Sequence, residues 1–361
     1  MNVKIITNTI ELENIQEKWN VLQERSMSTF YDTYQFKSAW WSSYKDDSDK
    51  SLFVITVFEN DKLIGLAPLL ISSKKENFIS YKELEFLGEG DYRNVLIDVN
   101  NNSFKILNLI FKTIEDNKDK WDRVNLTHIS NNTDLAKYIL TQTKYNKYLK
   151  YLVECPILNF NKYFNFEEYK KEFVSSSANK YRNKLKREIG YRFKVIKENS
   201  IFDEIVELHK KEQKYLNYKN KSKNRYSLYE DPKRYKYIEE LYSKSQDIIT
   251  FIIEDMDGNI IIYDTCYLWN KVLHSWNMAF DPKYQKYNVG RIINFEIMMY
   301  AFENKEISMF DFGCGRYPWK FEWTDEVVFN YQLDIWNNMS LYRKVNIIKQ
   351  VKNLIKSIIK K

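Results

Sequence analysis

The stretch 310–323, FDFGCGRYPWKFEW, combines acidic, basic, thiol and glycine residues within a few positions. Its start, Asp311-Phe-Gly-Cys-Gly, has the D-x-G-x-G spacing of a loop that cradles the nucleotide of S-adenosylmethionine. Such a loop follows the first strand of a doubly wound sheet and needs several βα units after it. Only residues 316–361 follow Gly315, and Tyr317 stands where close helix packing needs another glycine. The methyltransferase interpretation is therefore excluded.

A second candidate loop lies upstream, where Gln285-x-x-Asn288-x-Gly290 connects an expected strand to an expected helix. Backbone N–H groups and the dipole at a helix N-terminus bind phosphate groups well. Asn and Gly are the residues that most easily adopt positive φ in such a turn. The spacing indicates a pyrophosphate site, and the alternative interpretation is an ordinary strand-to-helix loop.

The elements expected around these loops occur in the same order in both halves of the chain. The first half predicts helices at 11–25 and 36–44, a hairpin over 51–72, a helix from 103 to about 117 and a strand at 123–129. The second half predicts a hairpin over 248–270 turning at Asp257-Gly258, a strand at 272–280, a helix over 291–305 and a strand at 308–313. The repetition predicts two copies of one α/β (α+β) domain.

Composition agrees with two packed domains. The chain has 361 residues with only 8 Gly and 5 Pro, so no flexible linker is expected. The net charge of +7 is too modest for a dedicated nucleic-acid-binding protein. Cys155, Cys266 and Cys314 have no CxxC spacing, so neither a metal site nor a disulfide framework is expected. The first residues lack the apolar core of a signal peptide, and a cytoplasmic location is expected.

The Gln285…Gly290 loop resembles the Q/R-x-x-G-x-G/A acyl-CoA pyrophosphate loop of the GNAT N-acyltransferase superfamily, although Asn288 replaces its first glycine. More specifically, the chain resembles the tandem-GNAT branch called CelD-like, related to Fem-type aminoacyl transferases. The resemblance rests on Phe36-x-x-x-Trp40, Leu63-Ile-Gly-Leu-Ala-Pro-Leu69, Phe86-Leu-Gly-x-Gly-Asp91-Tyr92 and Asp311-Phe-x-x-Gly315-x-x-Pro-x-Lys320-x-x-Trp323. This chain departs from the family at Cys314, Arg316 and Trp319, which leaves the acceptor open.

The resemblance implies transfer of an acyl group from a thioester to an amine or hydroxyl. Lys320 is expected to stabilise developing charge, and Asp311 to orient the acceptor or take its proton. Tyr317 is a candidate to return a proton to the thiolate, and His274 is a candidate base. Each also has a structural interpretation, as a surface, capping or core residue.

The resemblance also assigns binding residues. The expected donor, acetyl-CoA or another acyl-CoA, is placed at Gln285, Asn288, Val289, Gly290 and Arg291, with its pantetheine arm between strands 272–280 and 308–313. The acceptor is placed at Asp91, Tyr92, Arg93, Arg316 and Trp319. No metal ligand set is expected.

Two basic stretches suggest further partners. Residues 178–188, ANKYRNKLKRE, are interpreted as a solvated helix face, a phosphate contact or a nucleic-acid contact. Residues 341–361 predict a helix with Ile347, Val351 and Leu354 among one apolar face and lysines opposite. This helix either covers the domain core or lies on an anionic membrane surface, which would place the protein at the inner face of the membrane.

The sequence thus predicts two tandem GNAT-like domains, 1–160 and 161–340, each a mixed, mostly antiparallel sheet flanked by helices, followed by the basic helix 341–361. The expected function is acyl-CoA-dependent N-acyl transfer to an amino sugar or another cell-envelope or polysaccharide precursor. One alternative is aminoacyl transfer from transfer RNA to a peptidoglycan precursor, in which transfer RNA is the one nucleic-acid partner expected. The other is a non-catalytic partner in a polysaccharide-synthesis complex.

Overall fold

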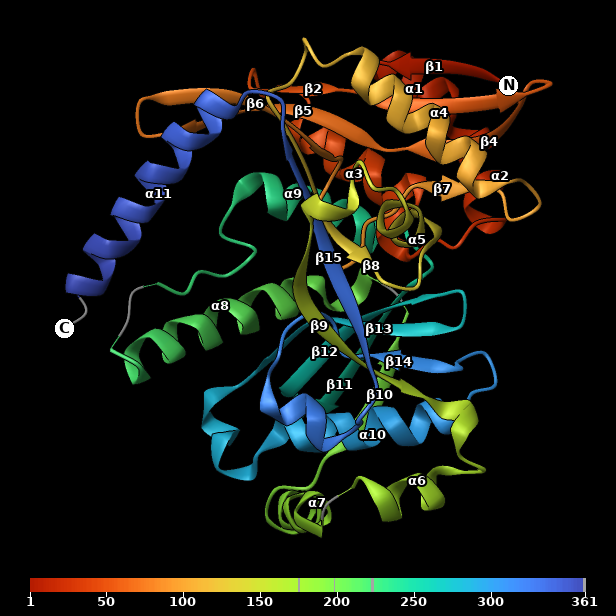
Figure 1. The fold of residues 1–361 in the computed structure, drawn as a ribbon. Coiled ribbons are helices and arrows are strands. Elements are labelled where there is room, and N and C mark those ends of the chain that lie inside the picture. The colour runs from red at the N-terminus through yellow and green to blue at the C-terminus, as the bar shows by residue number, and fades with distance from the viewer. Residues whose placement is uncertain (175, 198, 222–223, 360–361) are drawn as a thin grey trace. The chain divides into compact units, whose positions relative to one another are not determined.

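The computed structural model describes residues 1–174, 176–197, 199–221 and 224–359 (Figure 1). The chain divides into two compact units. Unit 1 holds Met1–Val153 and the segment from Phe329 onward, and unit 2 holds Glu154–Val328. The division at 153/154 lies close to the predicted boundary at 160/161, but residues 329–340 belong to unit 1 rather than to the second domain.

Unit 1 contains two sheets, with strands in the orders β1-β3-β4-β7 and β15-β8-β6-β5-β2. Strands β6 and β8 run parallel, and the pairs β1–β3, β3–β4, β4–β7, β15–β8, β6–β5 and β5–β2 are antiparallel. Its elements are β1 (Asn2–Ile6), α1 (Thr9–Asn14), α2 (Gln16–Glu24), α3 (Tyr34–Tyr44), β2 (Lys50–Leu52), β3 (Val54–Glu59), β4 (Lys62–Ala67), β5 (Leu69–Glu76), β6 (Ile79–Phe86), β7 (Leu96–Ile97), α4 (Ser103–Asp116), β8 (Arg123–Ser130), α5 (Asp134–Thr141), β15 (Val327–Trp336) and α11 (Met339–Ile359).

Unit 2 contains one sheet with the strand order β10-β11-β12-β13-β14-β9. Strands β13 and β14 run parallel, and their neighbours are antiparallel. Its elements are β9 (Leu149–Asn159), α6 (Phe166–Glu172), α7 (Ser176–Glu188), β10 (Arg192–Ile196), α8 (Phe202–Lys219), α9 (Pro232–Lys244), β11 (Ile248–Glu254), β12 (Ile260–Trp269), β13 (Val272–Phe280), the 3-10 helix η5 (Pro282–Tyr287), α10 (Val289–Glu303), β14 (Met309–Asp311) and the 3-10 helix η6 (Pro318–Glu322).

The two units share a plan. In each, antiparallel strands lead to a helix, α4 or α10, and then to a strand parallel to an earlier one, β8 to β6 or β14 to β13. Both helices form because apolar residues recur at helical spacing and pack on the sheet, as Ile106, Ile110 and Ile114 do in α4. The predicted class, two tandem α/β domains with mixed and mostly antiparallel sheets, is confirmed.

Strands β9 and β15 carry the chain from one unit to the other. After the β8 and α5 segment of unit 1, β9 enters unit 2 and its residues 157–159 pair with β14. After η6 of unit 2, β15 returns to unit 1 and pairs with β8. Each unit is therefore completed by a strand that follows elements of the other unit in sequence.

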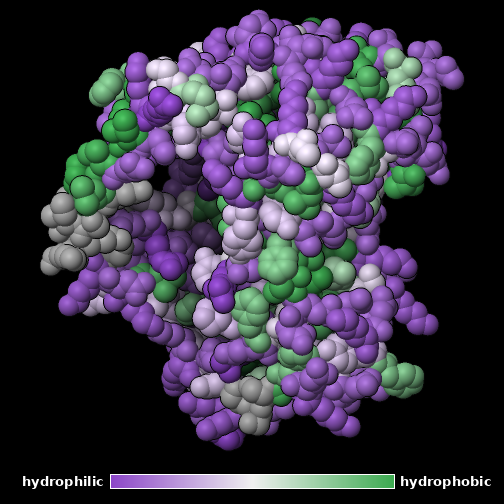
Figure 2. All heavy atoms as spheres, viewed as in Figure 1, coloured by the Kyte–Doolittle hydropathy of each residue, from purple (hydrophilic) through white to green (hydrophobic). Residues whose placement is uncertain are grey.

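The C-terminal helix α11 belongs to unit 1, and the last two residues of the predicted segment 341–361 lie outside the described residues. Val345 is buried, whereas Ile347, Val351 and Ile355 are exposed and share one face. Green side chains lie along the described part of α11 in Figure 2. Within the described residues, each helix is either too short or too polar to span a bilayer.

Candidate functional site

A cavity of about 330 Å³ opens in unit 2 around the first turn of α10. Its walls come from α8, β12, β13, η5, α10 and η6, so one helix end is surrounded by apolar strand residues and two tryptophans. The lining residues are Glu212, Ile262, Met278, Phe280, Gln285, Asn288, Val289, Gly290, Arg291, Asn294, Trp319 and Trp323. All five residues that were predicted to bind the acyl donor line this cavity.

The turn that begins α10 forms part of the wall of this cavity. Asn288 is left-handed, with φ 53° and ψ 49°, and within the described structure its side chain makes no cap hydrogen bond to the helix. A Cβ atom added at Gly290 would meet no atom within 4 Å. The helix dipole and orphan N–H groups make such a terminus suitable for an anion.

Strand β13 extends beyond its pairing with β14. The two strands pair from Val272–His274 to Met309–Asp311, where β14 ends, while β13 continues to Phe280. A β-bulge interrupts the β12–β13 register next to Thr265, so Trp276 has no partner residue in that register. Met278 and Phe280, which line the cavity, lie on the part of β13 beyond β14 and still pair with β12. The resemblance places the pantetheine arm between β13 and β14.

Arg291 is held in place by an ion pair. Its guanidinium donates to the carboxylate of Glu322, with N···O distances of 2.7 and 2.6 Å. This pair ties the first turn of α10 to η6, which carries Trp319. Gln285 accepts a hydrogen bond from the Tyr215 hydroxyl of α8. Arg291 and Gln285 are therefore anchored to two other elements of unit 2, η6 and α8.

Glu212 is a cavity residue that the sequence analysis did not single out. It lies on α8 and is 7% exposed, and its Oε1 accepts the Phe280 N–H at 3.3 Å. Burial raises the pKa of this carboxyl to about 7, opposed by the Phe280 N–H and by Arg225. In sequence it sits in the charged run HKKEQK, which is typical of a solvated helix face. A carboxyl with a pKa near 7 can exchange a proton with a bound substrate at neutral pH.

His274 and Asp311 form a buried pair at the last paired positions of β13 and β14. Nδ1 of His274 lies 3.4 Å from Oδ2 of Asp311. Oδ1 of Asp311 also accepts the Gly313 N–H at 2.8 Å, which fixes the turn after β14. Nearby, Asp264 is 1% exposed and accepts the Ser275 hydroxyl, and burial raises its pKa to about 7. Two predicted catalytic residues thus meet at the end of β14, although neither lines the cavity.

Lys320 is buried, and its ammonium donates to the carbonyls of Gly313 and Cys314 at 2.8 and 2.9 Å. It also lies over the rings of Tyr317 and Trp319, 5.3 and 5.8 Å from their centroids. These two hydrogen bonds from the Lys320 ammonium link η6 to the Gly-Cys-Gly turn. The geometry gives Lys320 a positioning role for the wall that carries Trp319.

The remaining residues predicted in this stretch differ in exposure. Trp319 lines the cavity and packs on Phe312. The side chain of Arg316 is 80% exposed and lies 3.7 Å from Glu154, and Tyr317 is also exposed. Neither Arg316 nor Tyr317 lines the cavity.

The predicted acceptor residues Asp91, Tyr92 and Arg93 lie in unit 1, in the loop before β7. The Asn330 amide donates to the Asp91 carbonyl at 2.7 Å, and Arg93 N–H donates to the His128 carbonyl at 3.0 Å. Tyr92 is buried, and burial lowers the pKa of Arg93. This loop is a packed part of unit 1.

A buried lysine supports the same region of unit 1. Lys37 is 1% exposed and donates to the Leu87 carbonyl at 2.6 Å. Burial lowers its pKa to about 7, and the nearby Asp32 opposes that shift. Lys37 thus holds the backbone that leads into Gly88 as Lys320 holds the Gly-Cys-Gly turn of unit 2.

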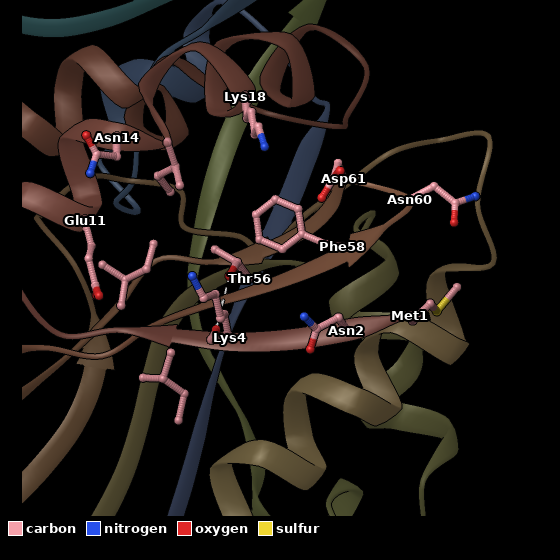
Figure 3. A pocket seen from close by; sticks show the side chains of 13 residues that line it. Met1, Asn2, Lys4, Glu11, Asn14, Lys18, Thr56, Phe58, Asn60 and Asp61 are labelled. Carbon is pink, nitrogen blue, oxygen red and sulfur yellow. Dashed lines mark hydrogen bonds between the residues drawn. The ribbon is translucent and has the colours of Figure 1, made fainter.

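A second cavity, of about 650 Å³, lies in unit 1 between β1, the first two helices and the β3–β4 turn (Figure 3). Phe58 lies in its middle, with Lys18 5.3 Å from the ring centroid. Its ionisable side chains Lys4, Glu11 and Asp61 are exposed. This groove contains none of the predicted site residues, and we assign it no function. Among residues 1–174, 176–197, 199–221 and 224–359, no cluster of His, Cys, Asp or Glu could hold a metal ion.

Comparisons with known proteins agree with the fold of the chain. Residues 174–321 match the model of the acetyltransferase (GNAT) domain. No curated protein matches the chain in sequence. FemX covers 95% of this chain and 99% of its own, with a TM-score of 0.60 at 12% identity. L-PGS from Bacillus licheniformis covers 92% and 96%, with a TM-score of 0.56 at 13% identity.

A conserved protein of unknown function from Bacteroides thetaiotaomicron VPI-5482 is also similar. It covers 92% of this chain and 100% of its own, with a TM-score of 0.58 at 11% identity. At such identities the likeness shows the fold alone. The matched structures span both units of the chain.

Proposed function

We propose that the chain is an acyl-CoA-dependent N-acyltransferase, starting from the match of residues 174–321 to the acetyltransferase (GNAT) domain model and from the similarity of its fold to that of FemX. The observation that carries the proposal is the uncapped, left-handed start of α10, which opens onto the cavity at Gly290. The pyrophosphate of the donor binds the first N–H groups of α10. The pantetheine arm follows β13 past Phe280 and Met278 toward the point where β14 joins it.

The acceptor amine loses its proton to Glu212 as its nitrogen forms a bond to the acyl carbon. The bond between that carbon and the sulfur of CoA then breaks, and the leaving thiolate takes up the proton that Glu212 holds. A carboxylate with a pKa near 7 is partly ionised at neutral pH and can take this proton without a large energetic penalty. The bulged strand β13 supplies a backbone N–H to the thioester oxygen as that oxygen becomes negative. The pair His274 and Asp311 fixes the end of β14 beside β13. Lys320 keeps Trp319 in place as one wall.

Calorimetry with acetyl-CoA tests the donor. The unmodified chain is expected to bind with a micromolar Kd, and Gly290→Trp is expected to abolish binding because the indole fills the space above the helix terminus. Gly290→Ala is the matched control: its Cβ enters open space, so binding is expected to persist. Equal thermal unfolding of the three proteins shows that the fold is intact. Unchanged binding by Gly290→Trp would remove the proposed phosphate site.

A second candidate donor is an aminoacyl transfer RNA, and helix α7 favours it. This helix packs on α10 and η5, where Arg182 pairs with Glu296 at 2.6 Å and Lys184 lies 5.5 Å from the Tyr287 ring centroid. Lys180 and Lys186 of the same helix are exposed. A protein that binds charged transfer RNA but not acetyl-CoA would support this candidate. Binding of neither ligand would support a non-catalytic role.

The acceptor is proposed to be an amino sugar or another cell-envelope precursor, as the family resemblance implies. The contacts predicted for it from that resemblance are Asp91, Tyr92, Arg93, Arg316 and Trp319. Helix α11 supports action near a membrane surface. Its exposed Ile347 and Val351 share a face, and the basic Arg343 and Lys344 lie one turn earlier.

Co-sedimentation with vesicles tests this membrane contact. The chain is expected to bind vesicles that contain anionic phosphatidylglycerol more strongly than neutral ones. The variant with Ile347→Glu and Val351→Glu is expected to lose that binding, since both charges enter the exposed face. A variant with Lys349→Glu, away from that face, is the control. Equal binding by the Ile347→Glu, Val351→Glu variant would contradict a role for α11.

A further inference from the structure

Two cysteines that lie far apart in sequence meet in unit 2. Cys155 is on β9, Cys314 is in the turn after β14, and their Sγ atoms are 2.9 Å apart. The backbone is fixed on both sides of the pair. Phe312 N–H donates to the Pro156 carbonyl at 3.1 Å, and Gly315 N–H donates to the Glu154 carbonyl at 2.9 Å. These bonds hold the two cysteines opposite each other across neighbouring strands.

The two thiols differ in access to solvent. Cys155 is fully buried, whereas Cys314 is partly exposed. A soluble reagent therefore reaches Cys314 first, and Cys155 is positioned behind it to react with whatever forms there. An exposed thiol with a second thiol beside it is the arrangement found at reversible oxidation sites. Cys266, the third cysteine, is fully buried in the sheet beside Asp264, and burial raises the pKa of its thiol well above the usual range.

We propose that Cys155 and Cys314 form a reversible disulfide by exchange with a low-molecular-weight disulfide. The Cys314 thiolate attacks one sulfur of the reagent, forms a mixed disulfide and releases one reagent thiol. The Cys155 thiolate then attacks the Cys314 sulfur, forms the protein disulfide and releases the second reagent thiol. The protein loses two electrons and two protons, and these reduce one reagent disulfide to two thiols.

The sulfur atoms are already close, so the second step needs only small movements. A disulfide joins sulfur atoms about 2.05 Å apart and requires the Cα atoms of the two cysteines to lie within about 7 Å of each other. The hydrogen bonds on either side keep the two backbones at strand-pairing distance. Exchange inside such a pair competes well with a second soluble thiol, because the attacking group has a high effective concentration.

The bridge would affect the turn that supports the cavity wall. The carbonyl of Cys314 accepts a hydrogen bond from Lys320, whose helical turn also carries Trp319. A covalent link at Cys314 joins this turn to β9 in addition to the hydrogen bonds already present. Neither cysteine lines the cavity. The inference therefore stands whether or not the proposed acyl transfer is correct.

Peptide mapping after controlled oxidation tests the proposal. The full-length protein is equilibrated with mixtures of reduced and oxidised glutathione, remaining thiols are blocked by alkylation in denaturant, and peptides are analysed without reduction. The expected result is a cross-linked peptide containing Cys155 and Cys314, with the mass of two hydrogen atoms lost. Cys266 is expected to be alkylated in the same sample and serves as the internal control. Dithiothreitol is expected to reverse the cross-link fully.

Two variants make the outcome decisive. In Cys314→Ser, no cross-link is expected and Cys155 should stay unmodified before denaturation. In Cys155→Ser, Cys314 should stop as the glutathione adduct, because its second reaction partner is missing. A stable adduct at Cys314 in the unmodified chain would overturn the proposal, as would a cross-link that involves Cys266. Absence of any cross-link across the whole range of glutathione ratios would overturn it as well.

Discussion

The helices α4 and α10 have corresponding places in the two units, but their first turns differ. In unit 1, Asn102 is extended and its side-chain oxygen accepts the Lys105 N–H at 3.0 Å, which caps α4. In unit 2, Asn288 is left-handed, and in the described structure its side chain makes no such bond to α10. The Asn102 side chain thus caps α4, whereas in the described structure the left-handed Asn288 begins α10 without a side-chain cap.

The next helical positions strengthen this contrast. Two residues after the cap, α4 has Phe104, whose ring packs 5.6 Å from Tyr138, and α10 has Gly290 with open space above it. The same fold therefore yields a closed helix terminus in unit 1 and an accessible one in unit 2. The two units therefore differ at the positions where the proposed donor site lies, whereas the order of helix and parallel strand is the same in both.

Exchange of the residue at the second helical position should have the largest effect. Gly290→Phe gives α10 the residue that α4 has, and its ring should occupy the donor space. We expect acetyl-CoA binding to weaken at least ~100-fold, about 3 kcal/mol, by calorimetry. Phe104→Leu in unit 1 is the matched control and should leave binding unchanged. Equal loss in both variants would mean that the contrast between the helices is irrelevant to binding.

Removal of the proposed base should be next. Glu212→Gln keeps the shape of the side chain but cannot accept a proton, so kcat should fall roughly 100-fold while KM changes little. In the unmodified enzyme, kcat/KM should rise with pH through about 7, because the raised pKa of Glu212 leaves it protonated at lower pH. That rise should be missing in Glu212→Gln. A pH profile shared by both enzymes would assign the proton transfer to another group.

The two buried lysines offer a comparison in stability. Lys320→Met leaves two carbonyls without their donor, so the free energy of unfolding should fall by about 2–3 kcal/mol. Lys37→Met affects the Leu87 carbonyl, and it also removes a cation whose pKa burial lowers to about 7. The loss should therefore be smaller in Lys37→Met. Denaturant unfolding of both variants measures the difference, and a greater loss in Lys37→Met would contradict this argument.

The smallest effects should come from the two cap asparagines. Asn288→Ala should cost about 1 kcal/mol because alanine disfavours positive φ, and Asn288→Gly should cost little. Asn102→Ala should also cost about 1 kcal/mol, but through the lost cap bond, whereas Asn102→Asp should keep that bond. If Asn288→Asp preserved the free energy of unfolding as fully as Asn102→Asp, both asparagines would be acting through their side chains.

The sequence predicted those parts of the fold that local patterns control. The hairpins at 51–72 and 248–270 were found because turn residues separate two β-rich runs, and Gly258 indeed has φ 90°. The left-handed residue at 288 was indicated by residue type alone. Long-range pairings were not predicted. No predicted element corresponded to β9 or β15, because each of them pairs with a strand more than a hundred residues away in sequence.

The candidate site was predictable to the same extent. The loop 285–291, which lines the cavity, was singled out because its glycine and asparagine readily adopt positive φ. Glu212 was missed because its burial results from the packing of α8 on β13, which its charged neighbours in sequence do not reveal. The pairing of Cys155 with Cys314 was also missed, since the spacing of cysteines cannot report which strands become neighbours.

Because β9 and β15 connect the two units, the order of synthesis affects how the units fold. Unit 2 is continuous in sequence, whereas unit 1 includes β15, which follows unit 2. Because synthesis proceeds from the N-terminus, unit 2 can fold before β15 is available to pair in unit 1. Until residues 329–336 leave the ribosome, one edge of β8 has no strand to pair with. An exposed strand edge is prone to aggregation. A nascent chain that stalls after unit 2 should therefore be more dependent on chaperones than one that is complete.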